Sequence, residues 1–221
     1  MDKNALDLWD NSGLLSIDWQ NKRLWINVIN HMTVSALLAQ ALAYRLTEAG
    51  ISIMCKEVIT ASLIHDWSKR NEEEARENAR LKNKDPTVAA DIISQKASGK
   101  VNSLLGPIIA SLYRVMGHEG IERASRRALT PEEKILLYTD CCVSDNKITT
   151  YKNRANKLRP HYEPGGRYEE ATKWFKDKFG KTRQEKYDEI VLPIQEEFAS
   201  ILKVSPNLLS VAFAPPDLCE I

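Results

Sequence analysis

The sequence of 221 residues predicts an all-α protein. Apolar residues recur at the three- and four-residue spacing of helices through most of the chain, and alternating strand patterns bounded by turns are nearly absent. No period of twenty to fifty residues repeats, which argues against a repeat architecture. We therefore expect residues 1–221 to form a single all-helical domain.

Two helices are predicted in the first third of the chain. One is expected from Asn21 to Glu48, and Gly50 follows it as a residue that can end a helix in the left-handed conformation. The other is expected from Cys55 to about Asp66, where apolar and small residues are so dense that both faces look buried. This second helix should run through the domain centre.

The middle of the chain predicts three further helices. Residues from Arg70 to Lys84 are charged and favour a helix, most simply one with a solvated face. Helical patterns resume over Asp85–Lys96 and Val101–Met116. They should stop at the Gly117–Gly120 stretch, because glycine interrupts helices.

A capping motif marks the next helix. Thr130 can cap, Pro131 suits the first helical position, and Glu133 can reach back in a capping box. We expect a helix from there to about Val143.

The remaining chain is also expected to be helical. Arg159–Gly166 contains Pro and Gly and predicts a loop, and Tyr168–Phe179 predicts a helix. Arg183–Lys203 predicts another helix, interrupted near Pro193. Ser205 followed by proline predicts a cap before a short apolar terminal helix.

Charge and cysteine content restrict the partners and the compartment. With 31 Lys and Arg against 30 Asp and Glu, no charge excess would attract a nucleic-acid polymer or an anionic membrane. The amino terminus lacks the apolar segment of a secretory signal, and no long uncharged apolar window predicts a membrane span. The four cysteines lack paired C-x-x-C spacing, so we expect reduced, packing thiols in a cytoplasmic protein.

Four residues on three separate helices could bind a metal ion. His31 lies on an inward-facing apolar stripe, His65 and Asp66 end the most buried helix, and Asp140 sits among apolar residues of the capped helix. Singly, each has an ordinary alternative: a core histidine, an exposed helix end, or a salt bridge. Together, two imidazoles and two carboxylates suit a catalytic divalent ion. A separation of more than about 6 Å between Asp140 and His65 would rule out a shared ion.

The order of these residues resembles the HD-domain superfamily of metal-dependent phosphohydrolases. The resemblance rests on His31, on His65-Asp66 within LIHDWSK at residues 63–69, and on Asp140 within YTDCCVSDNKI at residues 138–148. It covers about residues 21–162, which leaves residues 163–221 as a C-terminal helical extension.

The resemblance implies an HD-type helical bundle in which His31, His65, Asp66 and Asp140 ligate one divalent ion. The reaction would be hydrolysis of a phosphate ester of a nucleotide or small phosphorylated metabolite by a metal-activated water. Asp66 could also orient that water. A His₂Asp₂ set accepts Mn, Fe, Co, Ni or Zn, and Mg is a further candidate.

Two more residues are catalytic candidates. Lys69 follows Asp66 by about one helical turn and could contact a phosphate, with a solvent-exposed lysine as the alternative. His118 could support the site, contact substrate or add a ligand, or be a surface loop histidine. His161 is assigned no role, and Arg114, Lys147 and Arg154 are phosphate-binding candidates left outside the expected site.

Two other functions remain open at this point. The chain could be a non-catalytic HD-like module that binds metal or senses a nucleotide. Some HD-like proteins instead hold a di-iron centre and use dioxygen, which requires additional histidine ligands, and only His118 is well placed to help. The substrate and the oligomeric state cannot be derived from the sequence.

Overall fold

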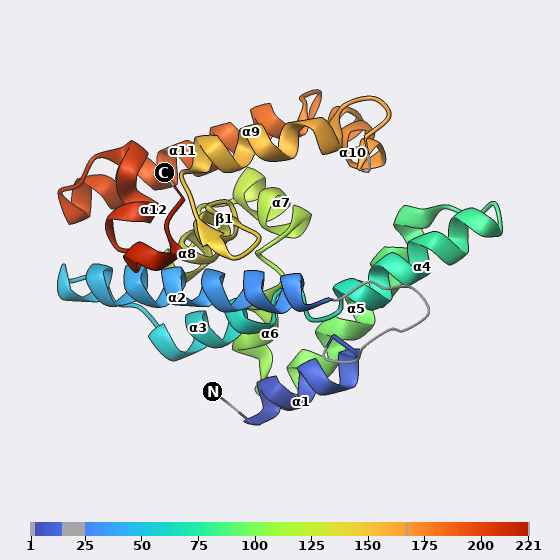
Figure 1. The fold of residues 1–221 in the computed structure, drawn as a ribbon, viewed down its shortest axis with the longest axis horizontal. Helices are drawn as coiled ribbons and strands as arrows, with labels where there is room; N and C mark the ends of the chain where they lie inside the picture. Colours follow the sequence, from blue (N-terminus) through green and yellow to red (C-terminus); the bar gives the residue numbers. More distant parts are fainter. Residues whose placement is uncertain (1–2, 15–24, 167, 221) are drawn as a thin grey trace.

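The computed structural model describes residues 3–14, 25–166 and 168–220, apart from the side chains of two residues in the first helix. The described chain is almost entirely helical, which confirms the predicted all-α class (Figure 1). Its elements, in chain order, are α1 (Lys3–Ser12), α2 (Ile26–Glu48), α3 (Cys55–Ile64), α4 (Lys69–Leu81), α5 (Pro86–Leu105), α6 (Pro107–Tyr113), α7 (His118–Arg126), α8 (Pro131–Asp140), β1 (Val143–Ser144), β2 (Lys147–Ile148), α9 (Tyr151–Tyr162), α10 (Glu169–Phe179), α11 (Arg183–Leu202), η1 (Pro206–Leu208), α12 (Leu209–Ala212) and η2 (Pro216–Leu218).

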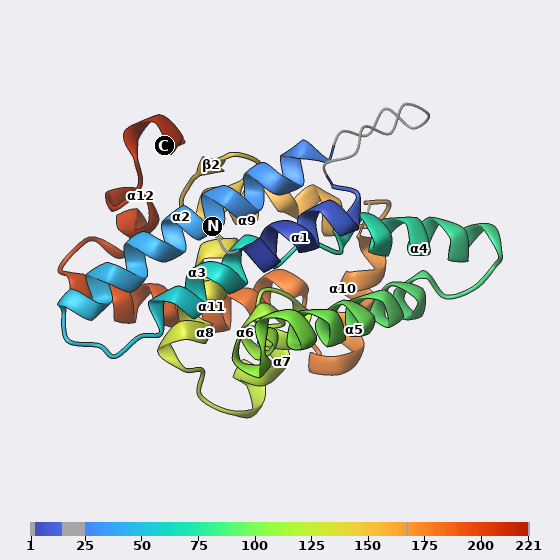
Figure 2. The ribbon, with the colours of Figure 1, turned by 90° about the horizontal axis from the view of Figure 1, so that it is seen from below.

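Helix α2 is the long axis around which the other helices pack. In Figure 1, α9 and α11 lie on one side of it and α1 and α3 on the other. Helices α4 and α5 form an antiparallel pair that projects from one end, as both ribbon views show (Figures 1 and 2). Among the described helices α2 alone is long and apolar enough to cross a membrane. Core helices of soluble proteins pass the same test, so this property says nothing about location.

The buried apolar side chains form two clusters. The larger cluster joins the second half of α2 to α3, α8 and α11, and the smaller joins the first half of α2 to α1, α5 and α6. Met32 belongs to the smaller cluster and Val34 to the larger, so the two clusters meet along α2 just beyond His31. Because apolar side chains are buried on both sides of this junction, each half of α2 is held against its own set of neighbouring helices.

Local capping chemistry ends and starts helices where the sequence predicts it. Helix α2 ends at Glu48, where Gly50 has a φ of 93° and its N–H donates to Thr47, while Ile51 donates to the carbonyl of Leu46. This pair of hydrogen bonds is a Schellman motif. The predicted residues 21–24 at the start of this helix lie outside the described residues, and the described helix begins at Ile26.

The predicted capping box of α8 is present. The Thr130 side chain accepts from the Glu133 N–H, and the Glu133 carboxylate accepts from the Thr130 N–H. The helix stops at Asp140, earlier than the expected end near Val143. The chain then forms a two-stranded hairpin in which Val143 pairs with Ile148.

The predicted break between Asp85–Lys96 and Val101–Met116 is wrong. Helix α5 runs unbroken through Gly99, and the break falls at Gly106, whose φ is 86°. An exposed glycine weakens a helix only by about 1 kcal/mol, whereas Pro107 has no N–H with which to continue one. Proline, and not the first glycine, therefore sets the boundary.

A helix does end before Gly117, as predicted, because α6 stops at Tyr113, but residues 118–120 are not a break, because α7 begins at His118. Gly120 lies against the preceding turn: a Cβ atom at this position would come within 2.0 Å of the Val115 carbonyl oxygen. The glycine permits close backbone packing and does not end a helix.

Two prolines lie inside helices, although Pro160 was expected in a loop and Pro193 at a helix interruption. Helix α9 continues through Pro160 to Tyr162, so Arg159–Gly166 is not wholly a loop, and α11 continues through Pro193 to Leu202. Proline has no N–H, so the carbonyl group four residues before it lacks its helical hydrogen bond. Both prolines are exposed, so a water molecule can donate to that carbonyl instead. The terminal helix starts after Ser205 as predicted, but the Ser205 side chain makes no capping hydrogen bond.

Candidate metal centre

The four predicted ligands lie at three helix positions that the fold brings together. His31 is in the second turn of α2, His65 and Asp66 directly follow α3, and Asp140 is the last residue of α8. Both imidazoles are buried, at 8% and 7% exposure, while the two carboxylates are partly exposed. His65, Asp66 and Asp140 lie at helix ends, where a side chain can reach a neighbouring helix without disrupting the apolar packing between the two helices.

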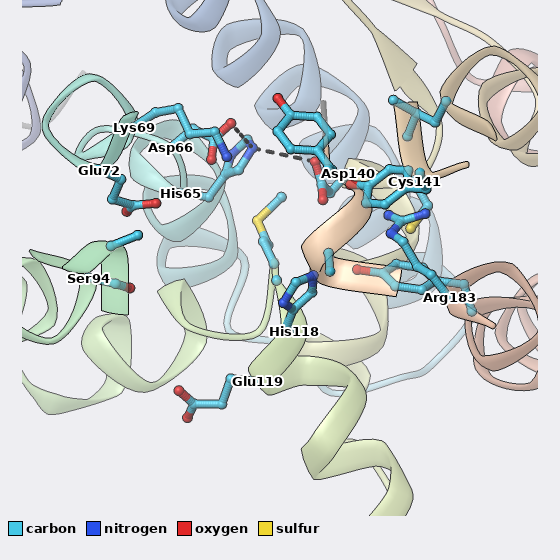
Figure 3. Close-up of a pocket in the computed structure, with 18 of the residues that line it drawn as sticks. His65, Asp66, Lys69, Glu72, Ser94, His118, Glu119, Asp140, Cys141 and Arg183 are labelled. Carbon is cyan, nitrogen blue, oxygen red and sulfur yellow. Dashed lines mark ion pairs between the residues drawn. The ribbon is translucent and has the colours of Figure 1, made fainter. Parts of the chain in front are cut away.

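Asp140 is the centre of this group. Its Oδ1 atom accepts a hydrogen bond from Nε2 of His31 at 3.0 Å and lies 3.5 Å from Nε2 of His65. Oδ2 of Asp66 lies 4.0 Å from the same His65 nitrogen (Figure 3). Asp140 and His65 are therefore well inside the 6 Å limit set for a shared ion.

A backbone hydrogen bond orients His65. Its Nδ1 atom donates to the Ser62 carbonyl at 2.8 Å, which leaves Nε2 directed at the two carboxylates. In the described part of the structure, this buried Nε2 has no hydrogen bond. Metal-binding histidines commonly hold one nitrogen to a carbonyl and coordinate through the other, so the arrangement fits a ligand.

The electrostatics of the group favour positive charge between the carboxylates. Burial opposes the charged form of His65, but Asp140 and Asp66 outweigh it and raise its pKa to about 9. Burial likewise opposes ionisation of Asp140, yet His31 and His65 hold its pKa well below the ordinary value. A potential that favours imidazolium also favours a divalent cation at the same place.

Three of the residues form a cluster of donor atoms that could hold a metal. Single ligand atoms of His31, His65 and Asp66 lie within 4.8 Å of one another. Asp140 is outside this cluster but contacts both of its imidazoles. Ligands bound to one ion at 2.0–2.2 Å lie no more than about 4.4 Å apart, so the cluster has nearly the size of a coordination sphere.

Lys69 lies on the cavity wall next to the group. It is the first residue of α4, and its amide donates to the Asp66 carbonyl at 3.0 Å. The nearby Asp66 carboxylate raises the pKa of Lys69 above its ordinary value, against the effect of burial. Lys69 in turn lowers the pKa of Asp66, although burial opposes this. The lysine is therefore a permanent cation beside the candidate ligands.

His118 is placed differently from the sequence-based expectation. It is in the first turn of α7, not in a loop, and its ring stacks on Trp174 and meets the edge of Phe175, both at 5.1 Å between centroids. Desolvation by the surrounding protein, with help from Arg183 and Lys69, lowers the pKa of His118 to about 3. This histidine lines the same cavity but is not in the cluster of candidate ligands.

The other noted residues have varied positions. His161 is in the last turn of α9, not in a loop. Arg114 pairs with Glu119, and Lys147 donates to the carbonyl of Asp217. Arg154 lines the cavity.

A cavity of about 970 Å³ opens beside the candidate ligands. His31, His65, Asp66 and Asp140 form part of its wall, together with side chains from α4, α5, α7, α9, α10 and α11. Its volume is within the range of small-molecule sites. One residue in this wall, Arg183, gave no signal in the sequence, because only the packing of α11 brings it near Asp140.

No family model, curated protein or solved structure matches the chain significantly. The resemblance to the HD-domain superfamily therefore rests on the sequence motifs alone.

Proposed function

We propose that the chain is a metal-dependent phosphohydrolase of the HD-domain type, acting on a phosphate ester of a nucleotide or other small metabolite. One observation carries the proposal: two imidazoles and two carboxylates from three helices converge at the edge of a cavity around a buried His65 nitrogen that lacks a hydrogen bond in the described structure. Such a mixed N/O set is typical of catalytic divalent metals.

His31, His65, Asp66 and Asp140 would hold one divalent ion, drawn from Mn, Fe, Co, Ni, Zn or Mg. A bound divalent cation supplies Lewis-acid activation of water and neutralises charge on a phosphoryl oxygen. A single ion is favoured because the described cluster contains two histidines and His118 is engaged with Trp174 and Phe175.

The protein's own groups would bind and orient the reactants. The Asp66 side chain is 30% exposed and faces the cavity, so its carboxylate can accept a hydrogen bond from a water molecule and orient it. Lys69 can donate to an anionic phosphate oxygen, since an ammonium group has donors and no lone pair. The cavity walls would exclude bulk water around the ester.

The test is a hydrolysis screen of metal-free and metal-reconstituted protein against nucleotides and small phosphate esters. We expect metal-dependent phosphate release that is lost in Asp66→Ala, while the helical circular dichroism and melting temperature stay near those of the wild type. Metal binding without any hydrolysis would indicate a sensor module. Two irons per chain with oxygen consumption would indicate an oxygenase.

A further inference from the structure

Two arginines in the cavity wall differ from the others in their partners. Arg76, Arg114, Arg123 and Arg126 also line the cavity, and each pairs with a glutamate. Within the described residues, Arg154 of α9 and Arg183 of α11 have neither an ion pair nor a side-chain hydrogen bond, and the Nε atom of each is buried. A buried N–H donor without a hydrogen-bond acceptor is costly, so the Nε atoms of this pair call for an explanation.

Aromatic rings hold Arg183 in place. Its guanidinium lies over the ring of Tyr187, at 3.9 Å from the centroid, and over that of Tyr162, at 4.2 Å. Cation–π contacts of this kind fix the group without using its N–H donors. The first two acidic residues of α11 have other partners: Glu185 forms a capping box with Thr182, and Asp188 accepts hydrogen bonds from Tyr151 and Gln184. The donors of Arg183 thus remain available.

The two arginines lie beside the candidate metal centre. Figure 3 shows Arg183 next to Cys141, which follows Asp140 in the chain, with Lys69 on the opposite side of Asp140. Arg154 and Arg183 line the same cavity, and Gln184, which follows Arg183, donates at 3.1 Å to the hydroxyl of Tyr151, three residues before Arg154 on α9. An anion held by this pair would therefore share the cavity with a phosphate held near Lys69.

We propose that Arg154 and Arg183 form an anion-binding subsite, which binds a second phosphate or carboxylate group of the substrate. The substrate class, which rests on the proposed function, is a phosphate ester that carries another anionic group. The ester phosphate lies toward Asp66 and Lys69, and the second anion lies toward α9 and α11. The planar guanidinium of Arg183 supplies paired N–H donors that match two oxygens of either anion.

The subsite is tested on the full-length, metal-free protein by calorimetric titration with inorganic phosphate and, separately, with malonate. Metal-free protein removes phosphate binding through an ion. Arg183→Met and Arg154→Met should each raise the Kd for the preferred anion by about tenfold or more, because charge-assisted contacts are lost. The comparison of phosphate with malonate tells which anion the subsite prefers.

Arg45→Met is the matched control. Arg45 also lies over an aromatic ring, that of Phe213, but it is exposed and outside the cavity, so its loss should leave both titrations unchanged. Arg183→Lys keeps the positive charge but lacks the paired N–H donors of the guanidinium, so this variant should bind the anion with intermediate affinity. If Arg183→Met fails to fold, Arg183→Lys and Arg154→Met decide the question by the same titrations.

Two results would overturn the subsite: wild-type protein that binds neither anion at millimolar concentration, or folded Arg154 and Arg183 variants that bind as the wild type does. Both results come from titrations of metal-free protein, so they say nothing about whether the metal-loaded protein hydrolyses a phosphate ester. The metal-loaded protein could hydrolyse no ester while anion binding still depends on both arginines. That result would support the anion-binding subsite and contradict the proposed phosphohydrolase activity.

Discussion

The Nε2 atom of His31 lies 3.0 Å from Oδ1 of Asp140, although 109 residues separate the two in the chain. This contact joins the second turn of α2 to the last residue of α8 and places one carboxylate against both candidate imidazoles. Metal binding and the position of α8 should therefore depend on the same side chain.

Asp140→Asn should lower the metal content of reconstituted protein to well below one ion per chain. An amide is a poorer ligand than a carboxylate and no longer supplies negative charge to His31 and His65. Metal analysis after dialysis measures the loss. Glu74→Gln is the control, because Glu74 is exposed, is not part of the cavity wall and pairs with Arg70 at 2.9 Å. Full metal occupancy in Asp140→Asn would remove Asp140 from the ligand set.

Lys69→Ala should leave metal stoichiometry unchanged and lower kcat/KM on a phosphate ester by roughly tenfold to a hundredfold. The expected loss is that of one charge-assisted contact, on the order of 1.5–3 kcal/mol. If the contact strengthens in the transition state, kcat falls as well, whereas uniform binding only raises KM. Lys96→Ala, on α5 outside the cavity, should have wild-type kinetics. Unaltered kinetics in Lys69→Ala would show that Lys69 does not contact the substrate.

The ionised Glu133 carboxylate should make the free energy of unfolding depend on pH below about pH 5. Burial opposes its ionisation, but Arg127, the Thr130 N–H and Arg123 outweigh burial and lower its pKa to about 2. Because the folded pKa lies below the unfolded one, the stabilisation is complete above about pH 5 and is lost as the pH falls toward 2. It amounts to about 3 kcal/mol at most.

Urea unfolding of wild type and Glu133→Gln between pH 7 and pH 2.5 measures this effect. The variant should be less stable at pH 7 and should lose less stability on acidification. Glu185→Gln is a matched control, since Glu185 forms the same capping box with Thr182 but is exposed and has no arginine partner in the described structure. Parallel pH profiles for wild type and Glu133→Gln would contradict the assignment.

Gly120→Ala should destabilise the fold by about 1–3 kcal/mol or more, because the new methyl group would meet the Val115 carbonyl oxygen at 2.0 Å. Gly99→Ala should instead stabilise it by about 0.5–1 kcal/mol, since nothing lies within 4 Å of that position in the middle of α5. Chemical unfolding of both variants checks the contrast. Equal effects would mean that α7 can move away from Val115 at little cost.

The all-α class, and those helix boundaries that depend on chemistry within a few residues, could be predicted from the sequence alone. The Thr130–Glu133 capping box and the end of α2 before Gly50 are of this kind. The sequence also selected four candidate ligands, because polar residues at inward positions of apolar helices need partners wherever the helices pack. Whether those residues bind a metal stays a prediction.

Other features depend on the packing of helices that are distant in the chain. The glycine at 120 resembles a helix breaker in sequence, yet it serves the close packing of α7 on Val115. The prolines at 160 and 193 resemble interruptions, yet their exposed positions let the helices continue. The approach of Asp140 to His31 and the place of Arg183 beside Cys141 depend on how distant helices bury their apolar faces against one another. Burial is a property of the whole packed chain, so no window of sequence contains it.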